Sequence, residues 1–252
     1  YAHDETSRLY QSLSGKSPYE GRSHTAEVYA TYELAKHLGI LAGVDYRFLQ
    51  SLDDKATPKH PTMNIASPYL SLFIKNISGF NIELGGRYNK HSKYGDNFSY
   101  SINPSYLINE NIKVFANIAS AFRTPSLGEL YGQYGSNPDL KPETSQTYEG
   151  GFQTSFKKID FRATYFSRKI KNVITTNSFY NYVNLNKQDD HGIEIEANIK
   201  VDKKLQAKLF YAFVDGEVTT NNGVKDTTYF NLVKRPKHSI GATITYQITP
   251  RL

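Results

Sequence analysis

The sequence predicts an all-β fold, an antiparallel transmembrane β-barrel to which this chain contributes one part. The first observation is a period-two alternation of apolar and polar residues in segments of about ten or more residues. The second is that the connections between these segments are alternately very short and very long. Short turns at one rim and long loops at the other are typical of outer-membrane barrels.

The alternation is clearest near the end of the chain. Residues 239–248 are polar and apolar in strict turn, and Ile193 and Ile195 alternate with Glu194 and Glu196. Successive side chains of a strand point to opposite faces, so each segment has one apolar and one polar face. An amphipathic helix would repeat every three to four residues, and these segments do not.

The same pattern predicts about eleven strands. Their expected ranges are 24–34, 38–50, 67–76, 79–91, 96–108, 111–124, 143–157, 158–171, 187–200, 203–217 and 237–249.

The connections predict the orientation of the strands. Tight turns are expected near Ala35, Ile77, Glu110, Lys158 and Asp202. Long connections are expected over 51–66, 125–142, 172–186 and 218–236, with a brief exception at 93–95. Because short turns face the periplasm in such barrels, the first complete predicted strand, 24–34, should run from the outer rim towards the periplasm.

An odd number of strands leaves both edges of the sheet unpaired, and open edges do not persist in lipid. Either partner segments complete the cylinder, or the chain is a piece of a longer polypeptide. We expect the second, because the sequence also shows no signal peptide.

Composition supports a membrane sheet. The chain has 20 Tyr, 14 Phe and no Trp, with a net charge of +6, and its mean hydropathy is −0.55. The sequence contains no run of eighteen apolar residues, so it predicts no membrane-spanning helix. The absence of cysteine excludes disulfides and thiol chemistry. The basic residues are scattered, so we expect no nucleic-acid binding; basic outward loops would instead meet lipopolysaccharide phosphates.

A specific resemblance lies in residues 115–156. A strand ending Ala-Phe-Arg-Thr-Pro-Ser-Leu (121–127) is followed by a loop, by Asn-Pro-Asp-Leu-Lys-Pro-Glu (137–143) and by Tyr-Glu-Gly (148–150). This composite resembles the TonB-dependent outer-membrane receptors. The phrases at 189–194 and 234–238 resemble strand openings of the same family, so the resemblance covers nearly the whole chain.

The resemblance implies a barrel of about 22 strands filled by an N-terminal plug domain. Residues 1–252 would then be a portion of that barrel, with the plug domain and the terminal strands absent. It also implies location in the outer membrane of a Gram-negative bacterium, and energy supplied by the TonB complex acting through the plug. A surface lipoprotein is a further partner in some lineages.

Within the family, Leu-Gly-Glu-Leu-Tyr-Gly at 127–132 and the short gap before Asn137 most resemble the vitamin B12 (cobalamin) transporter branch. The resemblance therefore implies active uptake of cobalamin or a related corrinoid. A ferric siderophore or haem receptor of the same family is the alternative. A passive porin and a secreted all-β binding module are rival hypotheses from other classes.

Loops are where a rigid barrel contacts its ligand. Aromatic and amide side chains suit a large amphipathic small molecule edged with amides. The predicted ligand-binding residues are Tyr131, Gln133, Tyr134, Asn137, Tyr180, Tyr182 and, by resemblance at the mouth of the lumen, Arg235. For any one of them, packing within the loops or an interfacial girdle is an equally good explanation.

The sequence predicts no enzyme. It has no Gly-x-Ser-x-Gly, P-loop or His-Glu-x-x-His motif, and its seven histidines are dispersed. The polar strand faces, Glu194 and Glu196 included, are expected to line a hydrated lumen. No cofactor or metal is predicted: the pairs Asp53–Asp54 and Asp189–Asp190 would offer oxygens to calcium, but two adjacent carboxylates do not make a coordination sphere.

Overall fold

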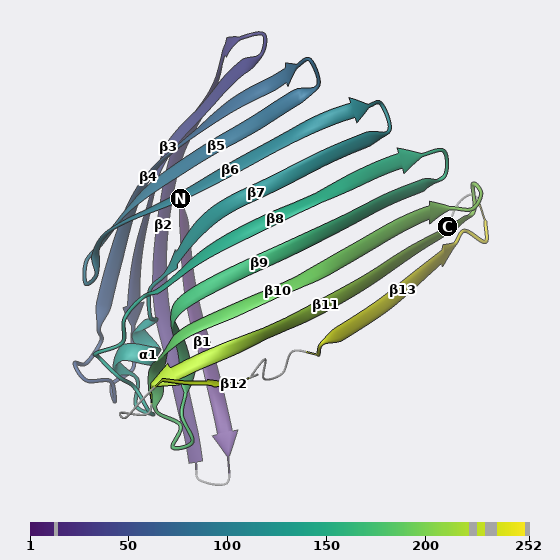
Figure 1. The fold of residues 1–252 in the computed structure, drawn as a ribbon. Helices are drawn as coiled ribbons and strands as arrows, with labels where there is room; N and C mark the ends of the chain where they lie inside the picture. The colour runs from purple at the N-terminus through teal and green to yellow at the C-terminus, as the bar shows by residue number, and fades with distance from the viewer. Residues whose placement is uncertain (13–14, 222–225, 230–235, 250–252) are drawn as a thin grey trace.

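The computed structural model describes residues 1–12, 15–221, 226–229 and 236–249 of the chain. They form one strongly curved antiparallel sheet of 13 strands with a single short helix among the described residues (Figure 1). The predicted fold class is confirmed. The strands are β1 (Ala2–Ser12), β2 (Gly15–Ala35), β3 (Leu38–Ser51), β4 (Thr62–Ile77), β5 (Phe80–His91), β6 (Gly95–Asn109), β7 (Ile112–Arg123), β8 (Glu143–Phe156), β9 (Ile159–Thr176), β10 (Tyr182–Lys200), β11 (Leu205–Asn221), β12 (Asp226–Tyr229) and β13 (His238–Tyr246), and the helix is α1 (Leu127–Tyr131).

Each strand from β1 to β12 pairs with the next in the chain, and β13 pairs with β11. Strand β11 therefore has two partners on one side: β12 pairs with its residues 218–221 and β13 with its residues 205–213. Within the described part of the chain no helix is long and apolar enough to cross a bilayer.

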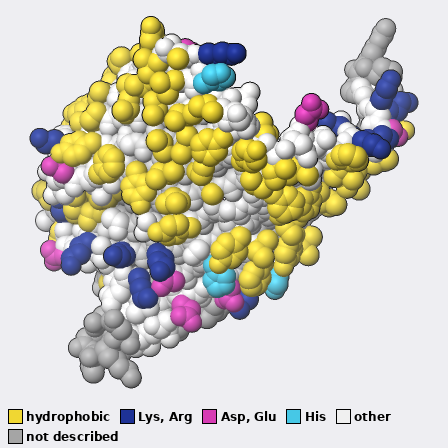
Figure 2. All heavy atoms as spheres, turned by 45° about the horizontal axis from the view of Figure 1, so that its top comes forward, with side chains coloured by type: hydrophobic (Ala, Val, Ile, Leu, Met, Phe, Trp, Pro, Cys, Tyr) yellow, Lys and Arg dark blue, Asp and Glu magenta, His cyan; other side chains and the backbone are white. Residues whose placement is uncertain are grey.

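The two faces of the sheet differ as the alternation predicts. Val28 is 78% exposed, Ile240 80% and Ile244 72%, so large apolar side chains cover the outer surface instead of a core. Figure 2 shows a broad hydrophobic surface with the charged side chains lying mainly towards its margins. A surface of this kind is stable where hydrocarbon is the solvent.

The opposite face, called the inner face here, is polar and internally bonded. Asp45, almost fully buried, lies 2.7 Å from Nη2 of Arg87 and 3.0 Å from Nε of Arg47. Ser67 and Asn89, also buried, bond at 2.9 Å. Because these groups satisfy one another across β3, β4 and β5, burying them is compatible with a stable wall.

The tight turns lie where the sequence predicts them. Residues 36–37, 78–79, 110–111, 157–158 and 201–204 connect strands at one rim. Gly79 has φ +86, and a Cβ there would lie 2.8 Å from the carbonyl oxygen of Leu107. Only glycine fits such a close approach without strain.

The number and length of the strands need correction. Strands β1 and β12 and residues 15–23 of β2 were not predicted. Strand β4 begins at Thr62, inside the expected connection 51–66, and β9 and β10 extend into the range 172–186 that was expected to be a long connection. That loop shrinks to residues 177–181. The reason is physical: the extensions of β9 and β10 lie against the outer loop 124–142, where Ile174 and Asn184 form hydrogen bonds, so contact with lipid does not impose the apolar alternation there.

Candidate functional site

The candidate site is the group of loops at the rim opposite the tight turns, and the loop 124–142 with α1 lies at its centre. Ser126 begins the helix with a capping box. Its Oγ accepts a hydrogen bond from the N–H of Glu129 at 3.2 Å, and its own N–H donates to Glu129 Oε2 at 2.7 Å. The sequence Ser-x-x-Glu encodes this cap, since each side chain satisfies a backbone donor of the other residue.

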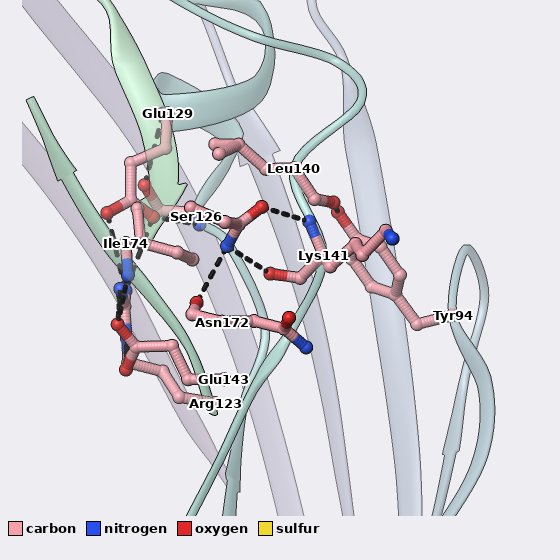
Figure 3. Close-up of polar contacts among 10 residues, drawn as sticks. Tyr94, Arg123, Ser126, Glu129, Leu140, Lys141, Glu143, Asn172 and Ile174 are labelled. Carbon is pink, nitrogen blue, oxygen red and sulfur yellow. Dashed lines mark hydrogen bonds and ion pairs between the residues drawn. The ribbon is translucent and has the colours of Figure 1, made fainter. Parts of the chain in front are cut away.

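Arg123, at the end of β7, joins this helix to the next strand. Its Nε and Nη2 donate to the two oxygens of Glu143 at 2.8 and 3.0 Å, and its Nη1 lies 3.3 Å from both oxygens of Glu129. Glu143 also accepts the N–H of Ile174 at 2.6 Å. Figure 3 shows these groups converging from β7, α1, β8 and β9. A bidentate guanidinium–carboxylate pair fixes direction as well as distance, so the two ends of the loop are held together.

A small apolar core anchors the loop to the rim. Leu130 is 1% exposed and Leu140 2%, and Pro125, Leu127 and Ala56 are buried with them. Each buried leucine side chain contributes about 1.5–3 kcal/mol relative to exposure. This core explains why a loop of nineteen residues with only one turn of helix keeps a defined shape.

The turn 92–94 between β5 and β6 also forms hydrogen bonds with the loop 124–142. Lys93 Nζ donates to the carbonyl of Pro138 at 2.7 Å and to Tyr131 Oη at 3.1 Å, and it lies 4.9 Å from the centre of the Tyr131 ring. Tyr94 Oη donates to the carbonyl of Leu140 at 2.9 Å. Burial, together with the nearby Tyr131 and Glu129, raises the pKa of Tyr94 to about 12. Tyr94 therefore stays a neutral donor at physiological pH.

The hairpin of β9 and β10 also bonds to the loop 124–142. Asn137 Nδ2 donates to the carbonyl of Tyr182 at 3.0 Å, and the N–H of Tyr182 donates to the carbonyl of Gly135 at 2.7 Å. Asn184 accepts from the N–H of Lys141 at 2.8 Å and donates to its carbonyl at 3.0 Å. The loop 124–142 is thus bonded along its length to segments that are distant in sequence.

The structure divides the predicted ligand-binding residues into two groups. The half-buried Tyr131, Asn137 and Tyr182 serve the contacts between loops described above. Tyr134 and Tyr180 are 59% and 82% exposed.

Two further predicted residues complete this set. Gln133 is half-buried, and its Nε2 has no hydrogen-bond partner among the described residues. Arg235 lies outside the described residues.

An exposed aromatic surface remains above these contacts. It consists of Tyr134, Phe179 and Tyr180, of which Phe179 is 81% exposed. The two loops that carry it meet where Gly135, at φ +59, lies against the backbone of Tyr180. The nearby amide of Asn177 is used within its loop: its Oδ1 accepts the N–H groups of Phe179 and Asn181 at 2.9 and 3.0 Å.

The contacts between loops also use side chains that were not among the predicted site residues: Lys93, Tyr94, Arg123, Glu129, Glu143 and Asn184. Arg123 and Glu143 stand inside the two phrases that carry the family resemblance, and that position was the available signal. Lys93 and Tyr94 follow an ordinary strand, and nothing in the sequence marks them.

The inner face holds a polar hollow of about 510 Å³ that lies over β8 to β11. Glu149, Arg162, Glu194 and Glu196 line it, and of these Glu194 and Glu196 were expected above to line a hydrated lumen. Arg168, also in its lining, bonds both oxygens of the buried Asp190 at 3.0 and 2.6 Å. No group of three or more His, Asp or Glu residues in the described ranges could hold a metal ion.

Comparison with known proteins places this geometry in context. A sequence model described as "TonB dependent receptor-like, beta-barrel" matches residues 1–251.

Solved structures with the same fold include the siderophore receptor PirA from Pseudomonas aeruginosa, with a TM-score of 0.72 and 20% identity over 96% of this chain and 51% of that one. A mutant of the ferric enterobactin receptor PfeA from the same organism has a TM-score of 0.71 and 18% identity over 94% of this chain and 48% of that one. The FrpB iron transporter from Neisseria meningitidis has a TM-score of 0.65 and 18% identity over 81% of this chain and 36% of that one. The chain therefore spans about half the length, or less, of these proteins.

Proposed function

Because this chain belongs to the TonB-dependent receptor-like β-barrel family, we propose that it forms part of the wall and mouth of an outer-membrane receptor that imports a scarce nutrient actively. Its apolar outer face meets lipid, and its long loops face outward. The receptor would include a plug domain and further barrel strands. The TonB complex would act on the plug, as is usual in this family.

The polar hollow of the inner face suits a plug contact. Glu149, Glu194 and Glu196 line it, and none of them forms an ion pair with a described residue. Carboxylates on a wall that a second domain covers are stabilised by basic or hydrogen-bonding groups of that domain. A passive porin, in which this face would meet only water, is the rival function.

For the ligand, we propose a ferric siderophore. The observation that carries this choice is the exposed aromatic surface of Tyr134, Phe179 and Tyr180, near which the amides of Asn137 and Asn177 already bond within the loops. Aromatic rings offer broad contact to a ligand that itself carries aromatic rings. The structural neighbours named above as siderophore, ferric enterobactin and iron receptors agree with this choice.

A corrinoid such as cobalamin is the second candidate. The resemblance of residues 127–132 to the cobalamin branch favours it. Its weakness is that Asn137, expected to exchange hydrogen bonds with corrin amides, instead donates to the carbonyl of Tyr182.

A binding titration of the purified receptor that contains this chain decides between the ligands. We expect sub-micromolar affinity for ferric enterobactin, used as a ferric catecholate probe, and at least about a hundredfold weaker binding of cobalamin. The double variant Phe179→Ala/Tyr180→Ala should weaken siderophore binding by about tenfold or more. Tyr106→Ala, an exposed tyrosine near the opposite rim, is the matched control and should bind normally.

Tight binding of cobalamin alone would replace the siderophore proposal with the corrinoid one. Uptake in cells lacking TonB tests the active mechanism separately. Undiminished uptake there would favour the porin.

A further inference from the structure

His91, the last residue of β5, forms hydrogen bonds with the turn 92–94, which in turn bonds to the loop 124–142. Its side chain is buried at the rim, with the residue 4% exposed. Its Nδ1 accepts two hydrogen bonds, from the N–H of Lys93 at 3.0 Å and from the N–H of Tyr94 at 3.3 Å. Both bonds require a lone pair on Nδ1, so this nitrogen carries no proton in the folded turn.

The two residues held in this way are the ones that reach across to the loop 124–142. Lys93 Nζ binds the carbonyl of Pro138 and Tyr131 Oη, and Tyr94 Oη binds the carbonyl of Leu140. These three contacts all start from a turn of three residues. A change at one imidazole nitrogen is therefore transmitted to one whole side of the loop.

We propose that His91 is a proton-controlled latch, in which the neutral imidazole holds the turn 92–94 against the loop 124–142 and protonation at Nδ1 releases that loop. In the imidazolium both ring nitrogens are donors, so the N–H groups of Lys93 and Tyr94 would lose their acceptor. The new positive charge would also lie beside the Lys93 ammonium. Both effects favour an open turn in mild acid.

The groups around His91 do not compensate for that charge. On its own turn the ionisable groups are Lys93 and Tyr94, whose ring centre lies 5.2 Å from that of His91. Its register partners on β4 and β6 are Ile65 and Gly95, which do not titrate.

Two other elements bring ionisable groups to this part of the rim. From α1, Glu129 and Tyr131 face Tyr94. From the loop 52–61, His60 lies 3.0 Å from Asp54, and the N–H of Thr57 donates to the carbonyl of Tyr131.

Hydrogen exchange read by mass spectrometry tests the latch on the ligand-free receptor in detergent, so the result does not depend on which ligand the receptor binds. Exchange is compared at about pH 7.5 and about pH 5.5 after correction for the intrinsic chemical rate. In the unmodified protein, residues 92–95 and 126–140 should exchange at least about fivefold faster in acid.

Three variants test whether the faster exchange in acid depends on His91. His91→Gln keeps an oxygen acceptor that does not titrate in this range, so its loop should stay protected at both pH values. His60→Gln and His37→Gln, the latter at the opposite rim with its Nδ1 on the carbonyl of Lys75, should respond like the unmodified protein. The proposal is overturned by equal protection of the unmodified loop at both pH values, by an acid response that persists in His91→Gln, or by one that disappears in His60→Gln.

Discussion

Two of the three glycines in the loop 124–142 stand there for opposite physical reasons. Gly128 lies in α1, and a Cβ there would meet nothing within 4 Å. Gly135 has φ +59, and a Cβ there would collide with the backbone of Tyr180. The first is dispensable, whereas the second sets how closely the two loops approach.

Substituting each glycine by alanine separates these roles. Gly135→Ala should destabilise the contact between the loops by about 2–3 kcal/mol, because it adds left-handed strain and a collision. Gly128→Ala should be neutral or stabilise α1 by up to about 1 kcal/mol. Limited proteolysis within residues 133–137 and 177–181 measures both; similar cleavage of the two variants would refute this account.

The predicted binding residues show how far residue-level inference reaches. Aromatic and amide side chains in outer loops fit a ligand surface, and Tyr134 and Tyr180 are indeed exposed. Asn137 suits a ligand equally well, but its side-chain amide donates to the backbone carbonyl of Tyr182. Composition cannot distinguish these outcomes, because an amide binds a backbone carbonyl as readily as it binds a ligand.

At the scale of elements, the tight turn 201–204 depends on one carboxylate. Asp202 Oδ1 accepts the N–H groups of Lys204 and Leu205 at 2.7 and 2.9 Å. These two bonds, opposed by partial desolvation and aided by the charges of Lys158 and Lys204, lower the pKa of Asp202 below its usual value.

The pH dependence of this turn follows from the sign of that shift. A lowered folded pKa means that the charged form is favoured by folding, so its contribution is present above the ordinary Asp pKa of about 3.9 and is lost as pH falls through the folded value. Asp202→Asn keeps an acceptor oxygen without the charge. We expect the variant to be less stable at neutral pH and to lose this part of the acid dependence, as followed by urea unfolding at several pH values.

Asp139→Asn, in the outer loop, is the control for a general change in charge. An equal loss of acid dependence in both variants would contradict the role assigned to Asp202.

At the scale of the whole molecule, the two faces of the sheet make opposite demands on a side chain. Ile240 lies on the outer face of β13, and Ser239 beside it lies on the inner face, opposite Ala212. Arginine at a lipid-facing position of a barrel costs about 2–4 kcal/mol near the bilayer midplane, whereas lumen positions tolerate polar groups.

This difference gives a matched pair of variants. Ile240→Arg should reduce the heat-modifiable, folded fraction of the receptor after refolding into vesicles, while Ser239→Arg should leave that fraction nearly unchanged. Equal behaviour of the two would mean that Ile240 does not face lipid.

The sequence by itself determined the fold class, the side of each central strand that faces lipid, the rim that carries the tight turns, and the family. These features repeat along the chain or are local: alternation follows from strand geometry, and a capping box needs only Ser126 and Glu129. It did not determine the outer ends of β9 and β10, because contacts with the outer loop replace contact with lipid there and the alternation is no longer required.

Only the tertiary structure decided what the outer loops do. The contacts of Lys93, Tyr94 and Asn137 join residues 45 or 46 positions apart, and the curvature of the sheet brings them together. A side chain's partner at that distance depends on where every intervening strand lies. For that reason the exposed aromatic surface and the His91 latch became visible only in three dimensions.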